Sequence, residues 1–186
     1  MKLNIKLIIL SLTISLLGVA PVFNLTSGIL PVAAQNQPTS TNTKFKSFVE
    51  KGRYSIQYPQ NWFIRRESKD LLFISNRKIP AVGGGAFPNY FIKTDVQIEN
   101  GSLQGKISTL DSNREPGERL IKKQNIKVDG KNAVRFWYSG GETEMILTLL
   151  PYKQNQIGSL TSFYKVNNAK LVPTLERIHS SFKSLK

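Results

Sequence analysis

The sequence predicts an α+β domain built on a mainly antiparallel β-sheet, and three observations lead to this prediction. Strand-like segments outnumber helical ones, short turns separate many of the strands, and only two segments space their apolar residues as helices do. Strands that are joined by tight turns run antiparallel, because a parallel crossover needs a much longer connection. We expect seven or eight strands and two helices, in a domain that begins near Phe45 or Phe48.

The first three strands are expected between residues 54 and 75. Tyr54–Pro59 alternates apolar and polar residues, so its apolar side chains share one face, and the proline ends the strand. Trp62–Arg66 is expected to be a second strand. Leu71–Ser75 is apolar enough to be buried on both faces of a sheet. Residues 79–90 are predicted to form a loop, because three consecutive glycines lie there between two prolines.

The remaining elements alternate strands with two helices. Helical spacing predicts a helix between Ser102 and Asp111. Asp129-Gly130 is a strong signal for a hairpin turn. The last helix is expected to carry one apolar stripe that includes Phe182, with Pro173 in its first turn. The further strands are expected at Phe91–Glu99, Leu120–Val128, Ala133–Tyr138, Met145–Leu150 and Ser159–Tyr164.

An export signal is predicted at the N-terminus. Lys2 and Lys6 precede a mainly apolar stretch, and small residues precede a cut after Ala34. We expect residues 1–34 to be a Sec-type signal peptide, since the arginine pair of the twin-arginine route is absent. The alternative is an uncleaved membrane anchor, because apolar residues continue beyond the first stretch. Residues 35–44 are polar and are expected to be flexible, which leaves residues 45–186 as the domain.

The chain is strongly basic and contains no cysteine. It has 26 Lys or Arg and 12 Asp or Glu, and loss of Lys2 and Lys6 with the leader lowers its formal charge from +14 to +12. This charge favours an acidic protein surface or an anionic lipid surface, and the export signal argues against nucleic acid. The alternative is a solvated surface that only maintains solubility. Disulfides and a lipid anchor on a cysteine are excluded.

Three motifs together resemble the PsbP-like family, over roughly residues 48–185. Tyr54-Ser-Ile-Gln-Tyr-Pro-Gln-Asn-Trp62 is similar to the family's opening F/Y-S-I-x-Y-P-x-x-W segment. Val128-Asp-Gly-Lys-Asn-Ala133 is similar to its G-x-x-A hairpin. Leu175-Glu-Arg-Ile-His-Ser-Ser-Phe-Lys183 is similar to its closing helix, with the I-x-x-S-F signature. The order and spacing of the motifs carry the resemblance, since each motif alone is weak.

The resemblance implies an antiparallel sheet sandwiched between helices, the Mog/PsbP/DcrB-type α/β/α sandwich. It further implies a non-enzymatic protein of the thylakoid lumen or periplasm, peripheral to the membrane. Such a protein would support assembly, stability or ion retention at the lumenal face of photosystem II. Calcium is a possible cofactor by this resemblance only. Cyanobacterial PsbP homologues commonly carry a lipid-anchor cysteine, so this cysteine-free chain is expected to be a divergent paralogue. A general envelope-associated binding module of the same fold is the alternative, and an enzyme that acts on an anionic substrate is a further one.

No catalytic residue is predicted. His179 is the only imidazole, and it is expected at the boundary of the last helix, beside the apolar stripe. Two carboxylate pairs, Glu142 with Glu144 and Glu115 with Glu118, could serve acid–base chemistry or could lie on a solvated edge. No dense set of oxygen ligands marks a metal site.

Basic pairs are the predicted partner-binding residues. The protein itself is expected to be a monomer. Adjacent residues of a strand point to opposite faces, so each pair places at most one charge on a given face. A basic cluster must therefore draw on several strands. The six predicted residues are Arg65, Arg66, Arg77, Lys78, Lys122 and Lys123.

Overall fold

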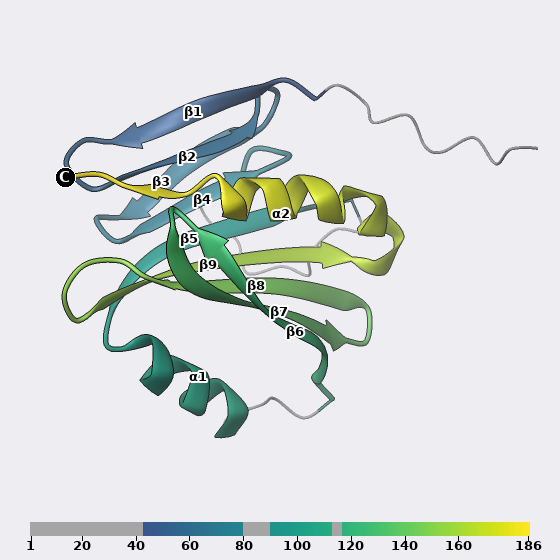
Figure 1. Cartoon of the computed structure of the whole chain (residues 1–186). Helices are drawn as coiled ribbons and strands as arrows, with labels where there is room; N and C mark the ends of the chain where they lie inside the picture. The colour runs from purple at the N-terminus through teal and green to yellow at the C-terminus, as the bar shows by residue number, and fades with distance from the viewer. Residues whose placement is uncertain (1–42, 80–89, 113–116) are drawn as a thin grey trace, which may run out of the picture. The chain divides into compact units, whose positions relative to one another are not determined.

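A computed structural model describes residues 43–79, 90–112 and 117–186, and their strands form two antiparallel sheets (Figure 1). The larger sheet has seven strands in the order β3-β4-β5-β9-β8-β7-β6, and the smaller has three in the order β1-β2-β10. The strands are β1 (Phe45–Glu50), β2 (Tyr54–Pro59), β3 (Phe63–Ser68), β4 (Leu71–Ser75), β5 (Lys93–Asn100), β6 (Arg119–Val128), β7 (Lys131–Gly140), β8 (Thr143–Pro151), β9 (Gln156–Lys165) and β10 (Lys183–Ser184).

The helices lie on opposite faces of the larger sheet. The first helix is α1 (Leu103–Ser112), and the second is α2 (Val172–Ser180), which a 3-10 turn, η1 (Val166–Leu171), precedes. One hydrophobic cluster joins the inner face of the larger sheet to α2 and to the smaller sheet. A second cluster joins the outer face to α1 through Ile107. The fold is therefore α+β and mainly antiparallel, as the sequence predicts, with helices on both faces and a small extra sheet beside α2.

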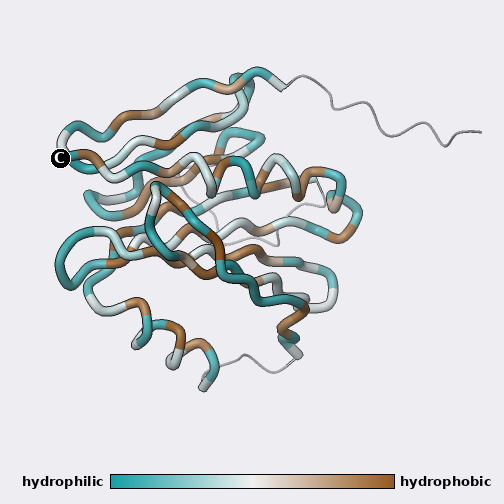
Figure 2. The backbone as a smooth tube through the Cα atoms, viewed as in Figure 1, coloured by the Kyte–Doolittle hydropathy of each residue, from teal (hydrophilic) through white to brown (hydrophobic). Residues whose placement is uncertain are grey.

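Alternating apolar side chains produce this layering. Along the strands, apolar positions recur between polar ones (Figure 2), and Tyr54, Ile56 and Tyr58 of β2 are all buried. Alternation places these side chains on one face of a strand, where burial stabilises each by about 1.5–3 kcal/mol. The predicted hairpin at Asp129-Gly130 joins β6 to β7, with positive φ values of 51° and 72°. That geometry is the one expected of a two-residue type I′ turn.

The structure changes several boundaries. Helix α2 ends at Ser180, so Phe182 lies beyond the helix in the link to β10 rather than on the helical stripe. Pro173 does lie in the first turn of α2. In β4 only Leu72, Ile74 and Ser75 are buried, so this strand is not fully covered on both faces. Its Leu71 and Phe73 are half-buried, and the cluster that packs against α1 includes no residue of β4.

The predicted leader and the glycine-rich loop lie outside the described residues, as does Glu115. The first described strand begins at Phe45. Within the described ranges, none of the helices combines the length and the hydropathy that a membrane span needs.

Candidate functional site

Several turns of the two sheets meet at one end of the domain, which we call the turn end. It consists of residues 51–53, 69–70, 129–130, 152–155 and 183–186. Backbone and side-chain hydrogen bonds tie these segments together. Leu185 N donates to Arg53 O at 2.9 Å, and Tyr152 Oη donates to the same carbonyl at 2.7 Å. Ser184 N donates to Asp129 Oδ2 at 2.9 Å. The antiparallel topology thus brings distant segments of the chain to one surface.

A polar cleft of about 470 Å³ opens at the turn end between the two sheets. Its charged lining consists of four cations and two carboxylates: Arg53, Arg66, Lys69, Lys153, Glu50 and Asp70. The buried side chains of Ile98 and Tyr152 add an apolar part to the lining. A concave site with a few convergent charged groups is the usual starting point for a binding-site hypothesis.

Two ion pairs hold the arginines of the cleft in place. Arg53 Nη2 lies 2.5 Å from Asp70 Oδ1, and Arg53 also donates to the carbonyl of Lys69. Arg66 pairs with Glu50, whose side chain is 23% exposed. Because these pairs are partly exposed, each adds little to stability, but both fix the direction of a guanidinium. The two lysines supply positive charge that no carboxylate within the cleft matches.

Burial raises the pKa values of two tyrosines near the cleft, Tyr54 and Tyr152. Burial raises the pKa of Tyr54 to about 12, although the nearby Arg53 lowers it in part. Burial also raises the pKa of Tyr152, with Arg53 again opposing the shift. Both phenols therefore remain neutral hydrogen-bonding groups at physiological pH. The Tyr54 ring stacks on Phe182 at 5.3 Å, which ties the smaller sheet to the segment after α2.

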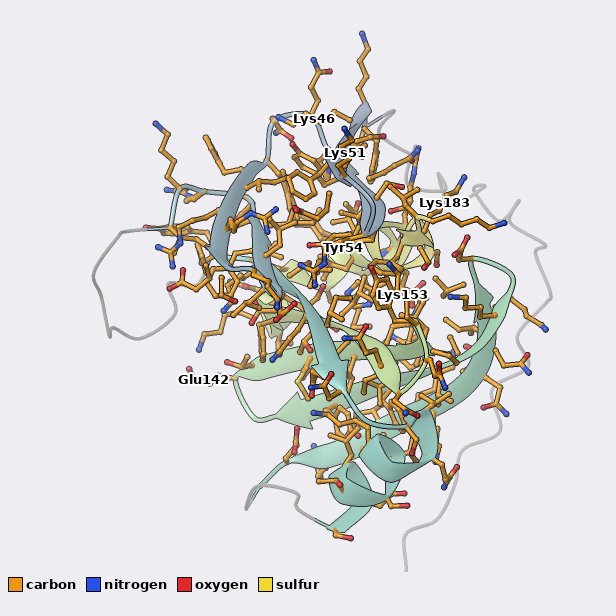
Figure 3. The ribbon with its side chains drawn as sticks, turned by 90° about the vertical axis from the view of Figure 1, so that its left-hand side faces the viewer. Lys46, Lys51, Tyr54, Glu142, Lys153 and Lys183 are labelled. Atoms are coloured by element: carbon orange, nitrogen blue, oxygen red, sulfur yellow. The ribbon has the colours of Figure 1, made fainter. Side chains whose placement is uncertain are left out.

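Further lysines surround the cleft and make the turn end strongly basic. Lys51, Lys153 and Lys183 lie on the side of the molecule that faces the viewer in Figure 3, around Tyr54. Lys131 belongs to the same end, since its Nζ donates to Tyr152 O at 2.7 Å. Asp129 lies at this end as well and accepts a backbone hydrogen bond. The turn end therefore carries a clear excess of positive charge.

The six basic residues predicted from the sequence do not form one patch. Arg66 belongs to the cleft, whereas Arg65 points to the other face of β3, pairs with Glu67 at 2.7 Å and lies over Phe73. Lys122 and Lys123 lie on β6, at the opposite edge of the seven-stranded sheet from β3. Their amines lie over aromatic rings of β7.

Arg77 and Lys78 lie beyond the other end of β4, away from the turn end. The Arg77 guanidinium lies 3.7 Å from the centre of the Tyr90 ring. The prediction therefore includes one residue of the cleft and misses Arg53, Lys69 and Lys153. Each of these three lies in a short turn between strands, as in Lys51-Gly52-Arg53 and Lys69-Asp70, and that placement was the signal available in the sequence.

His179 of α2 is fully buried between the helix and the larger sheet, so the expectation of a boundary position is wrong. Its Nδ1 lies 2.9 Å from Thr148 Oγ1, and its Nε2 lies 2.8 Å from Ser162 Oγ. Thr148 also accepts from Arg135 Nε at 3.0 Å, and Ser162 lies 2.7 Å from Thr94 Oγ1. His179 therefore joins a chain of hydrogen-bonded side chains that spans four adjacent strands of the sheet, β7, β8, β9 and β5.

The charges in this buried network favour a neutral imidazole. Desolvation lowers the pKa of His179 well below its usual value, and the nearby Arg135 lowers it further. Desolvation also lowers the pKa of Arg135, while Glu176 opposes that shift. Since Thr148 accepts from Arg135, its hydroxyl proton can be donated to Nδ1, and the ring proton then resides on Nε2. The network fixes α2 to the sheet, and none of its described members opens into the cleft.

The carboxylates considered for acid–base work have separate partners. Glu142 pairs with Lys165 at 2.9 Å, and this hydrogen bond lowers the pKa of Glu142. Glu144 accepts from Ser139 Oγ at 2.9 Å. Among the residues that the structure describes, no three His, Asp or Glu side chains gather as metal ligands would.

Several solved structures have a similar arrangement of sheets and helices. CyanoP, the PsbP protein of Synechocystis sp. PCC 6803, matches with a TM-score of 0.51 at 12% identity, over 81% of this chain and 98% of CyanoP. The chain has the PsbP-type fold. The Ran-binding protein Mog1p of Saccharomyces cerevisiae matches with a TM-score of 0.52 at 8% identity, over 77% of this chain and 97% of Mog1p.

A third protein with the PsbP-type fold is LpqN of Mycobacterium tuberculosis, which is involved in cell envelope biogenesis. It matches with a TM-score of 0.52 at 11% identity, over 80% of this chain and 88% of LpqN. No family model and no curated protein matches the sequence. The resemblance found in the sequence motifs is thus confirmed at the level of fold, and function must be argued from the site.

Proposed function

We propose that this protein is a non-enzymatic, exported binding protein that docks on an acidic membrane-protein surface through its basic turn end. The observation that carries the proposal is the cleft, where four cations face only two carboxylates and further lysines surround the opening. A surface with such an excess of positive charge attracts acidic partners and raises their association rate.

The finer proposal is a role on the lumenal side of photosystem II, in its assembly, stability or ion retention. The PsbP-type fold shared with CyanoP supports this role, as do the predicted export signal and the basic charge. The alternative is a general periplasmic, envelope-associated binding module. The similar fold of LpqN, a protein of cell envelope biogenesis, supports that alternative. Affinity pull-down from native membranes separates the two, because a photosystem subunit is recovered only in the first case.

The electrostatic part of the proposal predicts that salt releases the protein from its membranes. Raising salt from 0.1 M to 1 M shortens the Debye length from about 10 Å to about 3 Å, which screens contacts between exposed charges. We expect most of the bound protein to be washed from isolated membranes across this range. Immunoblotting of the washed membranes and supernatants measures the release. Full retention at 1 M salt would mean that an apolar contact or a membrane anchor holds the protein instead.

A further inference from the structure

The cleft has the size and charge of a small-molecule site. Binding of a small molecule there would be a function additional to the proposed docking on a membrane protein. Its volume of about 470 Å³ lies within the usual range for small-molecule pockets, roughly 300–1,000 Å³. Arg53, Arg66, Lys69 and Lys153 exceed Glu50 and Asp70 by two positive charges. A ligand that carries about two negative charges would balance this excess.

We propose that the cleft binds a phosphate monoester on a small, hydroxyl-bearing molecule such as glycerol 3-phosphate. A phosphate monoester carries about −1.5 to −2 charge at pH 7 and offers three strong acceptor oxygens. Those oxygens can bridge separate cations, whereas one carboxylate brings a single charge. The two lysines are the cations available to it, since both terminal nitrogens of Arg53 are already engaged and Arg66 is paired with Glu50.

The uncharged part of the lining suits the hydroxyl groups of such a ligand. Gln156 Nε2 and Asn100 Oδ1 lie 3.4 Å apart, at the long limit of a hydrogen bond, so both amides can form hydrogen bonds with a ligand instead. Glu50 and Asp70 each keep a second carboxylate oxygen that can accept from a hydroxyl. Ile98, which is buried at the cleft, can cover the carbon backbone of the ligand. The cleft therefore combines a cationic part with hydrogen-bonding groups for a polyol.

A titration of the purified protein tests this site without any membrane, so its outcome is independent of the docking proposal. Glycerol 3-phosphate is added while backbone amide resonances are followed by NMR. We expect saturable changes around Lys69, Asp70, Tyr152 and Lys153. Lys69→Gln with Lys153→Gln should raise the Kd at least about tenfold, because two charge-assisted contacts are lost. The control, Lys122→Gln with Lys123→Gln, removes the same charge at the far edge of the sheet and should leave the Kd unchanged.

Three matched compounds separate the features of the ligand. Glycerol lacks the phosphate and should not bind, inorganic phosphate lacks the hydroxyls and should bind more weakly, and succinate offers two carboxylates. Succinate binding as tight as that of glycerol 3-phosphate would overturn the phosphate assignment. Resonance changes spread evenly over the surface, or an equal loss of affinity in both double variants, would overturn the site itself.

The same phosphate monoester could be free or part of a lipid. Vesicles of phosphatidylcholine with phosphatidic acid present it on a membrane, and vesicles of phosphatidylcholine alone are the control. Binding to the phosphatidic acid vesicles that depends on Lys69 and Lys153 would identify a lipid source. Binding of glycerol 3-phosphate alone would identify a free metabolite. Absence of binding in both arms would reject the proposal.

Discussion

Replacing Phe182 by Ala is expected to lower the free energy of unfolding by about 3–5 kcal/mol, the usual cost of truncating a buried phenylalanine. Phe182 is fully buried, stacks on Tyr54 and meets the ring of Tyr152 edge-on at 6.2 Å. Truncation would leave a cavity and remove the contacts through which Phe182 joins α2 to Tyr54 and Tyr152. Urea unfolding, followed by circular dichroism, measures the change.

Phe63→Ala is the matched control for this substitution. Phe63 lies on the edge strand β3 and is 39% exposed, so the same truncation should cost less than about 1 kcal/mol. Equal losses in the two variants would contradict the assigned packing of Phe182. A loss below about 1 kcal/mol for Phe182→Ala would contradict it as well.

Mild acid is expected to destabilise the protein through His179. Its folded-state pKa lies well below the usual value of 6.5, so below pH 6.5 the unfolded chain binds a proton that the folded chain does not. The free energy of unfolding should therefore be level above pH 7 and fall by about 1.4 kcal/mol between pH 7.5 and 5.5. The charged groups facing the imidazole are Arg135 on β7 and, through Arg135, Glu176 on α2. Urea unfolding at several pH values measures the profile.

The sequence contains one histidine, which makes the source of this pH dependence testable. Carboxylates titrate mostly below pH 5, so the interval from pH 7.5 to 5.5 reports mainly on the imidazole. His179→Gln should lower stability at pH 7.5 and should remove most of the slope in this interval. A level profile in the unaltered protein, or the same slope in His179→Gln, would show that the imidazole is not held neutral.

The strands were predictable where apolar and polar residues alternate clearly, or where a short apolar run stands between polar residues. Tyr54–Pro59 and Leu71–Ser75 match β2 and β4 residue for residue. Strand β1 was missed because its apolar residues, Phe45, Phe48 and Val49, do not alternate. It forms because all six of its residues pair with β2, a tertiary interaction that local sequence does not reveal.

The candidate site was harder to predict than the fold. A strand pattern shows which residues face the core, but it does not show which turns come to the same end of the sheets. Lys69 and Lys153 are far apart in the sequence and meet only through the strand order. The partners of His179 are also separated from it in the sequence, by 31 residues for Thr148 and 17 for Ser162, and they belong to different strands. The prediction chose adjacent basic pairs such as Lys122-Lys123, which lie at the far edge of the larger sheet.

Membrane binding by two triple variants tests the docking surface most directly. Lys51, Lys69 and Lys153 belong to the turn end, whereas Lys78, Lys122 and Lys123 lie away from it, and all six side chains are exposed. Changing either set to Gln removes three charges, so net charge alone cannot distinguish the variants. Co-sedimentation with isolated membranes at 0.1 M salt measures binding, and circular dichroism confirms that both variants fold. If the turn end is the docking surface, the first variant binds at least about tenfold more weakly, as loss of charge-assisted contacts requires, and the second binds like the unaltered protein. Equal binding by the two variants would contradict the account.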